Sequence, residues 1–358
     1  MKNKITTIAF YLPQYHPIPE NDEWWGKGFT EWTNVGRAKP LFKGHYQPKV
    51  PTELGYYDLR LKEPRIEQAN MAKDAGIDAF SYWHYWLGNG KKLLEKPFEE
   101  VLKSKEPDFP FCFAWANHSW YKKTWDPGSE DKLLMEQKYL GVEDYIAHFE
   151  SVLPAFKDSR YLKVDNKPVF TVWSPLDIPD PREFTDLWND LAKDNGFDGV
   201  HFVGYTFKQN QTKEILKKGF DAVTVDYIKE VFENVSIFSK ISQKAINIIS
   251  KIPRRISYDS YSKFVLKSFN KNNNIYPCIV PNFDHSPRSG KRGVILTGSN
   301  PSKFGLLLQK TINILLKGSN KNKFLFIKSW NEWGEGNYLE PDLKYGNGFL
   351  KKVTEILK

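Results

Sequence analysis

The chain has 358 residues, 40% of them hydrophobic and 15% aromatic, and it carries a net charge of +9. This length provides one large buried core and requires no second domain, so we expect a single domain over residues 1–358. The positive charge is concentrated in residues 240–271, which hold eight basic side chains and one acidic side chain. Because the rest of the chain is nearly neutral, the composition excludes a general nucleic-acid binder.

Two features bear on the compartment in which the protein acts. Cys112 and Cys278 are the only cysteines, and both fall in apolar stretches expected to be strands. Buried thiols without a disulfide framework suit a reducing compartment. The first apolar run reaches Pro13 and Gln14 without a small-residue cleavage site, and no run approaches the ~20 residues of a membrane span. We therefore expect a soluble, cytoplasmic protein.

Apolar, β-rich runs alternate along the chain with helical patterns. The expected strands are Ile5–Leu12, Ala79–Trp86, Phe109–Ala116, Pro168–Trp173, Val200–Tyr205, Ala222–Asp226, Tyr276–Pro281 and Phe324–Trp330. The expected helices are Glu63–Asp74, Leu93–Leu102, Val142–Ala155, Pro181–Lys193, Thr212–Lys217, Ser262–Phe269, Pro301–Leu316 and Gly348–Leu357. Eight such units predict an α/β fold in which a parallel sheet closes into a (β/α)8 TIM barrel. The alternative, an open doubly wound sheet, would favour a GxGxxG motif after the first strand, and none is present.

Three connections are too long to be simple turns. They follow the first, third and sixth strands and cover roughly Tyr15–Leu61, His118–Gly141 and Tyr227–Tyr261, the last including a basic insertion at about 228–261. Long loops in a compact domain are usually functional or contain further elements. In a barrel, loops that follow strands lie on the C-terminal face, where active sites are built.

Polar and aromatic side chains gather at the expected ends of the strands. Such mixtures suit sugars, because aromatic rings stack on pyranose faces while polar groups bind hydroxyls. We therefore expect a glycan-binding surface that contains Tyr11, Gln14, Tyr15, His16, Trp83, His84, Trp86, Trp115, Asn117, His118, Trp173, Tyr205, Asp226, Tyr227, Asn282, Trp330, Asn331 and Trp333.

Two carboxylates, Glu332 and Glu335, lie three residues apart just past the last expected strand. Gly334 and Gly336 allow tight backbone turns there. Cleavage of a glycoside needs one protonated carboxyl at the leaving oxygen and one ionised carboxylate, and tryptophans nearby raise a carboxyl pKa by desolvation. We therefore predict that Glu332 and Glu335 are catalytic. The alternative is that both face solvent and cap the final helix.

The histidines leave a metal site as a further alternative. His16, His84, His118 and His285, with Asp226 and Asp284, stand near strand ends, but there is no local HxH or HExxH pair. Histidines near sugars more often serve as hydrogen-bond partners, so we expect no metal and no other cofactor.

Long, Trp-rich motifs carry a family resemblance. The runs FYLPQYHPIPENDEWWGKGFTEWTNV, SYWHYW, FAWANHSW and SWNEWGEGNYLEP resemble the WbsX-like family over Ile8 to about Pro341. Its members are described as glycosyltransferases of bacterial surface-polysaccharide gene clusters, such as those for O-antigen lipopolysaccharide. That family is similar to glycoside hydrolase family 99, the retaining endo-α-mannosidases and endomannanases with a (β/α)8 fold.

The resemblance implies roles for the two carboxylates. In the hydrolases, one glutamate helps the substrate 2-hydroxyl attack the anomeric carbon, giving a 1,2-anhydro sugar, and the other protonates the departing oxygen. By motif, Glu332 corresponds to the base and Glu335 to the acid. The hydrolase motif has a histidine where this chain has Gly334. This departure bears on the preference for mannose and leaves the carboxylate pair in place.

Three functions follow as expectations. The first is cleavage or transglycosylation of α-glycosidic, including α-mannosidic, linkages in bacterial polysaccharide, with retention. The second is nucleotide-sugar-dependent glycosyl transfer, which would normally show a diphosphate site. No DxD motif stands at a strand end, and Arg37, Lys39 and Arg288 are more simply surface charges. The third is a glycan-binding barrel without catalysis.

The basic segment bears on a lipid-linked substrate. Ile237, Ile241, Ala245, Ile248, Ile249 and Ile252 follow helical spacing, with lysines on other faces. We favour a helix that packs its apolar stripe on the barrel. The alternative is an interfacial helix that uses Lys240–Lys271 to place the enzyme peripherally on the inner face of an anionic membrane.

Overall fold

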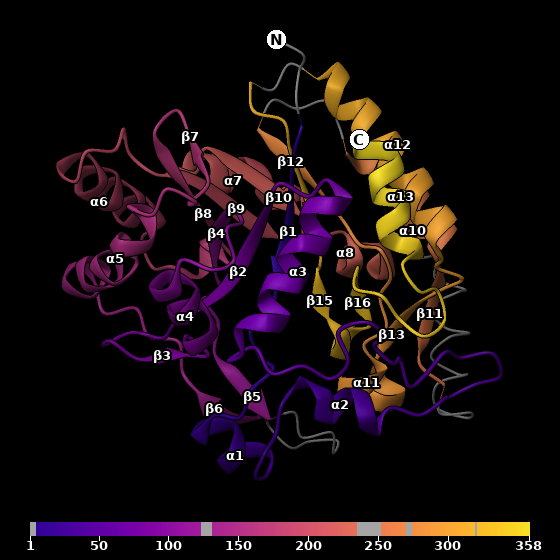
Figure 1. Ribbon diagram of the computed structural model, residues 1–358. Coiled ribbons are helices and arrows are strands. Elements are labelled where there is room, and N and C mark those ends of the chain that lie inside the picture. The colour runs from indigo at the N-terminus through magenta and orange to yellow at the C-terminus, as the bar shows by residue number, and fades with distance from the viewer. Residues whose placement is uncertain (1–4, 123–130, 235–251, 270–273, 319–320) are drawn as a thin grey trace.

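The computed structural model describes residues 5–122, 131–234, 252–269, 274–318 and 321–358. Eight parallel strands form one sheet, in the order β1, β2, β4, β8, β9, β10, β12 and β14. Because β1 pairs with both β2 and β14, the sheet closes into a barrel (Figure 1). The strands are β1 (Thr6–Tyr11), β2 (Ala79–Trp86), β4 (Phe111–Trp115), β8 (Lys167–Val172), β9 (His201–Thr206), β10 (Ala222–Val225), β12 (Ile275–Ile279) and β14 (Phe324–Ile327). The predicted (β/α)8 barrel is confirmed.

The barrel strands are buried on both faces, which explains their continuously apolar sequences. Every residue of β4, FCFAW, and of β9, HFVGYT, is buried. Helices cover the outer face of a parallel barrel while side chains fill its inside, so neither face of a strand meets water.

A helix follows each barrel strand. These helices are α3 (Lys62–Ala75), α4 (Lys96–Ser104), α5 (Val142–Phe156), α6 (Pro181–Asp194), α7 (Thr212–Lys217), α10 (Tyr258–Ser268), α12 (Pro301–Lys317) and α13 (Gly348–Leu357). Local signals set several starts: Asp180 and Asn300 accept backbone N–H groups as N-caps, each followed by a proline that fits the first turn. The C-terminal α13 packs against α3 and α12, so the last helix joins the first (Figure 1).

Two helices begin at positions other than those predicted. The helix expected from Leu93 begins at Lys96, because Lys92–Leu93 forms β3 against the end of β2. The helix expected from Ser262 begins at Tyr258, because the Ser257 hydroxyl accepts the N–H of Ser260 as a cap.

The long loops carry further elements, as predicted. After β1 come α1 (Pro19–Trp25) and α2 (Glu31–Arg37), and after β4 comes a hairpin of β5 (Trp120–Lys122) and β6 (Lys132–Met135). After β10 come α8 (Ile228–Glu233) and β11 (Arg254–Ser257), which pairs with β13 (Val294–Thr297). Most of the predicted helical stripe, residues 237–251, lies outside the described residues.

The last two loops carry short elements that complete this end of the barrel. After β12 come α11 (Ser286–Ser289) and the 3-10 turn η3 (Gly290–Arg292). After β14 come β15 (Asn331–Glu332), the 3-10 turn η4 (Trp333–Glu335) and β16 (Asn337–Tyr338). The other short elements are β7 (Lys163–Val164), η1 (Pro175–Asp177) and η2 (Gln209–Gln211).

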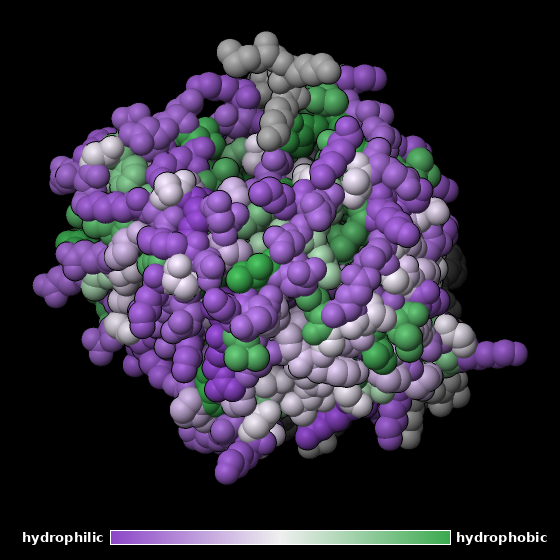
Figure 2. Space-filling view, viewed as in Figure 1, coloured by the Kyte–Doolittle hydropathy of each residue, from purple (hydrophilic) through white to green (hydrophobic). Residues whose placement is uncertain are grey.

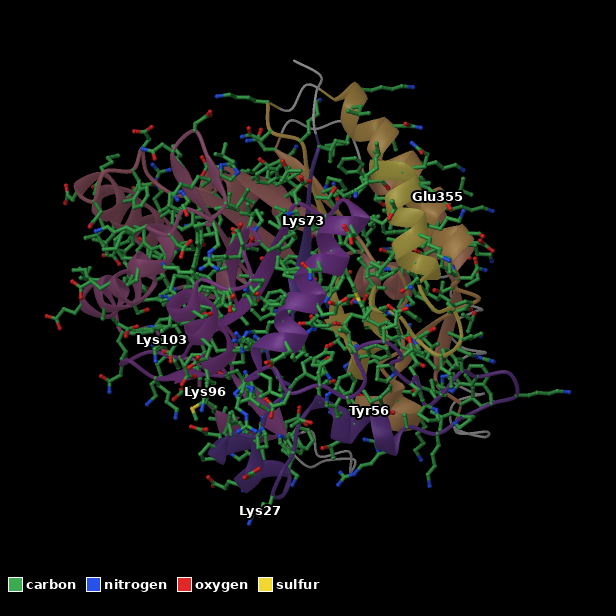
Figure 3. All side chains as sticks on the ribbon, in the orientation of Figure 1. Lys27, Tyr56, Lys73, Lys96, Lys103 and Glu355 are labelled. Carbon is green, nitrogen blue, oxygen red and sulfur yellow. The ribbon has the colours of Figure 1, made fainter. Side chains whose placement is uncertain are left out.

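The molecular surface is polar. Figure 2 shows a mostly hydrophilic face with scattered hydrophobic side chains, and the charged ends of Lys27, Lys103 and Glu355 lie at its edge in Figure 3. No described helix combines the length and apolarity needed to cross a membrane.

Candidate active site

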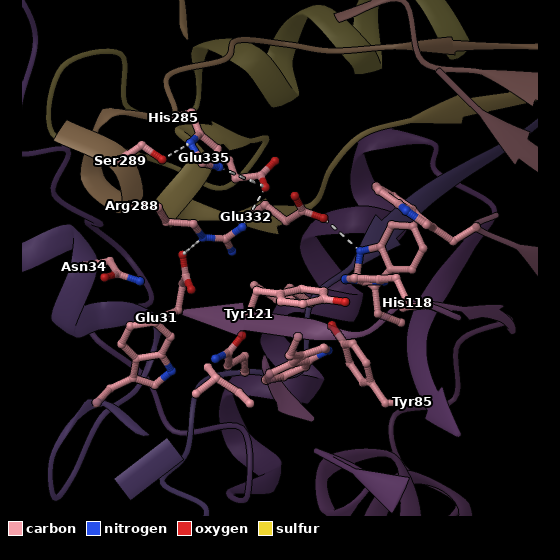
Figure 4. Close-up of a pocket in the computed structure, with 18 of the residues that line it drawn as sticks. Glu31, Asn34, Tyr85, His118, Tyr121, His285, Arg288, Ser289, Glu332 and Glu335 are labelled. Atoms are coloured by element: carbon pink, nitrogen blue, oxygen red, sulfur yellow. Dashed lines mark hydrogen bonds and ion pairs between the residues drawn. The ribbon is translucent and has the colours of Figure 1, made fainter. Parts of the chain in front are cut away.

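A cavity of about 550 Å³ opens at the C-terminal end of the barrel. Its walls come from β2 and from the loops after β1, β4, β8, β12 and β14, so residues distant in sequence meet there (Figure 4). The lining residues are Leu12, Gln14, Trp25, Phe29, Glu31, Asn34, Trp83, Tyr85, Ala116, His118, Ser119, Trp120, Tyr121, Leu134, Trp173, His285, Arg288, Ser289, Lys328, Glu332 and Glu335.

The loop that carries Glu332 and Glu335 is fixed by its own hydrogen bonds. The Ser329 hydroxyl accepts the Glu332 N–H at 2.8 Å and donates to the Asn337 carbonyl at 2.6 Å. The Asn331 side chain bonds the N–H and the carbonyl of Leu12 at 2.7 and 3.0 Å, which joins this loop to the end of β1. Gly336 has a φ of +53°, a left-handed turn that brings the chain back as β16.

The two carboxyl groups have opposite electrostatic environments. Burial raises the pKa of Glu332 to about 8, and the Trp83 indole N–H donates to its Oε1 at 2.8 Å. Burial would also raise the pKa of Glu335, but Lys328 and Arg288 outweigh it and hold that pKa well below its ordinary value. A hydrogen bond joins the two side chains. At neutral pH the pair therefore holds one proton, on Glu332, and one negative charge, on Glu335.

Two cations, the buried Lys328 and the partly exposed Arg288, create this asymmetry. Lys328 Nζ lies 3.4 Å from Glu335, 3.9 Å from Glu332 and 3.5 Å from Asp226. Arg288 donates from Nη1 to Glu335 at 2.6 Å and from Nε to Glu31 at 3.0 Å. Burial would lower the pKa of both cations, but the surrounding carboxylates raise it, so both remain charged. Arg288, expected at the surface, is instead a pocket residue.

Aromatic rings form the opposite wall of the cavity. The rings of Trp83 and Trp173 meet edge to face with their centroids 5.0 Å apart, and Trp173 stacks on Tyr205 with a centroid distance of 4.4 Å. Tyr85 and Tyr121 lie on the side of the cavity across from Arg288 (Figure 4). This pairing of an aromatic wall with a polar wall is the composition that sugar sites use.

The structure brings six of the sequence-predicted residues to the cavity. They are Gln14, Trp83, His118, Trp173, Glu332 and Glu335. Among those missed, Lys328 had a recognisable signal, since a lysine interrupts the otherwise apolar run FLFIKSW. Glu31 stands in the run GFTEW of the long first loop, and its only signal was that position.

Other predicted residues support the carboxylate loop from behind. The Tyr15 hydroxyl donates to the Asn331 carbonyl and accepts the Trp333 N–H, and the Trp333 indole donates to Glu340 at 2.6 Å. Asn282 donates to the Tyr338 carbonyl at 3.4 Å. These residues belong to the support of the site and do not line the cavity.

A third group lies outside the barrel wall. Successive side chains of a strand face opposite sides, so Trp83 and Tyr85 reach the cavity while His84 and Trp86 point outward. His84 lies 2.9 Å from His148 of α5, and Trp86 stacks on the same histidine at 4.9 Å. Trp115 packs under Phe184 of α6 at 5.5 Å. The site that we propose leaves these three predicted residues out.

The remaining predicted residues make structural contacts beside or below the cavity. Tyr205 donates to Asp226 at 2.6 Å, and the Asn117 amide bonds Ser174 on the neighbouring loop. Tyr11 donates to Gln68 of α3 at 2.6 Å, Tyr227 donates to Gln209, and Trp330 packs on Phe80 at 5.1 Å. His16 is buried, and this burial lowers its pKa to about 4.

The histidines considered as metal ligands do not converge. His118 and His285 line the cavity, whereas His84 lies outside the barrel wall and His16 is buried away from the lining. Across the described ranges, no three His, Cys, Asp or Glu side chains are grouped as metal ligands would be.

Solved structures with this architecture define its class. The GH99 endo-α-mannosidase of Bacteroides thetaiotaomicron, bound to bis-tris propane, covers 98% of this chain and 96% of its own, with 15% identity and a TM-score of 0.55. A glycoside hydrolase-like protein covers 100% and 95%, with 16% identity and a TM-score of 0.59. At these identities the likeness concerns the fold alone, a (β/α)8 barrel.

The sequence comparison gives the family. Residues 7–353 match the family described as "Glycosyltransferase WbsX", and the chain belongs to it, as its motifs predicted. The "Uncharacterized protein WxcX" of Xanthomonas campestris pv. campestris, from two strains, is 34% identical over 98% of this chain. The chain spans 49% of the length of these relatives, about half.

Proposed function

We propose that this protein cleaves or transfers α-linked sugars of bacterial surface polysaccharide, with retention, through Glu332 and Glu335. The observation that carries the proposal is the pair itself: the buried Glu332 and the partly buried Glu335 face one cavity, and their surroundings favour opposite protonation states. Glycosidase chemistry uses one protonated and one ionised carboxyl, and the pair supplies both.

The location of the proton sets a requirement on the mechanism. Burial, with the neighbouring Glu335, favours the protonated form of Glu332, while Lys328 and Arg288 favour the ionised form of Glu335. Under the roles that the family resemblance implies, Glu335 must receive this proton when the sugar binds, because it has to protonate the leaving oxygen. The hydrogen bond between the carboxyls is the path for that transfer. The reverse assignment, with Glu332 as acid, requires no transfer.

The charges of the cavity favour a neutral sugar. Arg288 is paired with Glu31 and Glu335, and Lys328 with Glu335, Glu332 and Asp226. Burial lowers the pKa of His285, so this histidine is neutral at pH 7. A uronate or a sugar diphosphate entering the cavity would therefore compete with carboxylates that already occupy these cations.

One observation favours a second candidate. The family's description is that of a glycosyltransferase, so a nucleotide or lipid diphosphate sugar is the alternative donor. A lipid-linked donor would suit an enzyme held at the inner face of a membrane by the basic insertion. In this alternative, Arg288 and Lys328 would have to leave their carboxylate partners in order to bind the diphosphate.

Turnover of a panel of α-linked oligosaccharides, with and without nucleotide sugars, tests the proposal in wild type, Glu332→Gln and Glu335→Gln. Cleavage or transfer without nucleotide, lost in both variants, supports it. Transfer that needs a nucleotide donor and survives both substitutions contradicts it. Glu355→Gln, at an exposed position, is the matched control and should leave turnover unchanged.

The same variants assign the roles with aryl α-glycosides. A substrate with a good leaving group needs little protonation, so it restores activity to the variant that lacks the acid. The variant that lacks the base stays inactive on both kinds of substrate.

A further inference from the structure

The turn between Glu332 and Glu335 contains Gly334. The space that a side chain at this position would fill is occupied by the carboxylate of Glu31. A β-carbon on residue 334 would lie 1.5 Å from Glu31 Oε1, 2.6 Å from Glu31 Cδ and 3.2 Å from Arg288 Nε. Distances below 3.0 Å are not sustained by real β-carbons, so any other residue here requires Glu31 to leave. Gly334 is therefore set by a close approach, in contrast to the left-handed φ of Gly336.

Glu31 is built into this position by its own helix. It is the first residue of α2, its N–H donates to the Gln14 carbonyl at 3.1 Å, and the preceding Thr30 forms a capping box with Thr33. Its side chain is only 1% exposed, and it lines the cavity. A buried carboxylate requires a partner, and Arg288 Nε provides one at 3.0 Å.

Arg288 thus lies between two carboxylates, as Figure 4 shows. Its Nε bonds Glu31 and its Nη1 bonds Glu335, so the guanidinium is fixed at two points. The charged and titratable groups packed around Glu335 come from four segments of the chain. They are Glu31 from α2, His285 and Arg288 from the segment of α11, Lys328 from the end of β14, and Glu332 from β15, with Asp226 beyond Lys328.

We propose that Glu31 is a positioning residue of the catalytic pair, which takes the place of a side chain at position 334 and holds Arg288 against Glu335. This inference rests on the proposed function of Glu332 and Glu335. Glu31 also balances charge: with Glu335 it offsets Arg288 and Lys328, so that Glu332 keeps its proton. Glu31, Glu332 and Glu335 all line the same cavity, so the three carboxyls surround one space.

A double-mutant cycle tests the steric part. In wild type, Gly334→Ala should lower kcat/KM by about 100-fold, because Glu31 must move and Arg288 loses one of its two partners. In the Glu31→Ala background the two closest contacts of the added β-carbon are gone and Arg288 Nε, at 3.2 Å, remains, so Gly334→Ala should cost about 3-fold or less. Gly36→Ala, at a glycine with no atom within 4 Å of an added β-carbon, is the control and should leave kcat/KM unchanged. Equal losses in the two backgrounds would overturn the proposal.

The pH dependence of kcat/KM tests the electrostatic part with opposite signs. Glu31→Gln removes a negative charge, so the alkaline limb, where the pair loses its proton, should move to lower pH by up to about one unit. Arg288→Gln removes a positive charge, so both limbs should move to higher pH. If Glu31 has only a structural role, Glu31→Gln should lower activity without moving the alkaline limb in the direction opposite to Arg288→Gln. That result would also overturn the proposal.

Failure of the inference about Glu31 can be distinguished from failure of the proposed function. Thermal unfolding of the four variants of the cycle, measured without substrate, reports the same steric coupling. If Glu332→Gln and Glu335→Gln are fully active, the proposed function fails while the coupling of residues 31 and 334 still stands. If turnover depends on the pair but the cycle is additive in both activity and unfolding, only the inference fails.

Discussion

Glu335 and Glu340 lie on opposite sides of the same loop. Different kinds of partner compensate for the removal of each carboxyl group from water. On the cavity side, Glu335 contacts the cations Arg288 and Lys328, which lower its pKa. On the far side, Glu340 accepts hydrogen bonds from Trp333, Tyr57 and Gln68 at 2.6 to 2.8 Å. There burial prevails over these neutral donors and raises its pKa to about 7.

The difference shows how one loop separates chemistry from support. Neutral donors satisfy a carboxyl without fixing its charge, which suits a residue that holds Trp333 in place. Cations fix the charge, which keeps Glu335 ionised in the protein without substrate. Three substitutions test this difference between the two carboxyl groups.

Lys328→Met should have the largest effect. It leaves Asp226, Glu332 and Glu335 around a neutral side chain, and loss of one partner from a buried ionic cluster lowers the free energy of unfolding by about 3–5 kcal/mol. Urea unfolding at pH 7 measures it. Lys323→Met is the matched control, because Lys323 is also buried but bonds backbone carbonyls, and it should cost about 1–2 kcal/mol. Equal losses would show that the carboxylates do not depend on Lys328.

Glu340→Gln should have an intermediate effect, about 1–3 kcal/mol, because the amide has one acceptor where the carboxyl has two. Its pH dependence has a defined sign. Folded Glu340 keeps its proton up to about pH 7, whereas the unfolded chain releases it near the ordinary value of 4.5. Its contribution thus favours folding below pH 4.5 and is lost as the pH rises to 7.

Unfolding free energies of wild type and Glu340→Gln, measured between pH 4 and pH 8, isolate this contribution from that of Glu332. The gap between the two proteins should narrow towards pH 7. A gap that is constant with pH would mean that folding does not shift the pKa of Glu340.

Trp83→Phe should have the smallest effect. It removes the N–H that donates to Glu332 Oε1, a bond worth about 1 kcal/mol, while it keeps an aromatic wall. Since that bond favours the ionised form, the pKa of Glu332 should rise, and the alkaline limb of kcat/KM should move to higher pH by less than about one unit. Trp86→Phe, on the outward face of the same strand, should leave the pH profile unchanged, and an equal shift would contradict the assignment of faces.

Sequence patterns predicted the barrel well because each strand is buried on both faces and several helices have local start signals. They also located the carboxylate pair, since it directly follows the last strand. The surface predicted at β2 and β4 also included His84, Trp86 and Trp115, which have aromatic side chains like Trp83 but face the helices. Composition at a strand end does not distinguish the two faces, whereas the alternation from Trp83 outward would have done so.

The ion pairs of the site could not be predicted from the sequence. Glu31 and Arg288 are 257 positions apart, and each alone is indistinguishable from a surface charge. Gly334 carried a hint, since a glycine beside a catalytic residue can mark a close approach. Which atom approaches it depends on the tertiary fold of the first loop.

The closure of the barrel by β1 and β14 has a consequence for synthesis. Gln14 and Glu31 come from the first strand's loop, while Lys328, Glu332 and Glu335 come from the last, and Asn331 joins the two through Leu12. A ribosome makes the first group some three hundred residues before the second. A nascent chain halted before β14 therefore has neither a complete ring nor a charge-balanced pocket, and the pocket can form only after this strand has emerged and inserted beside the first.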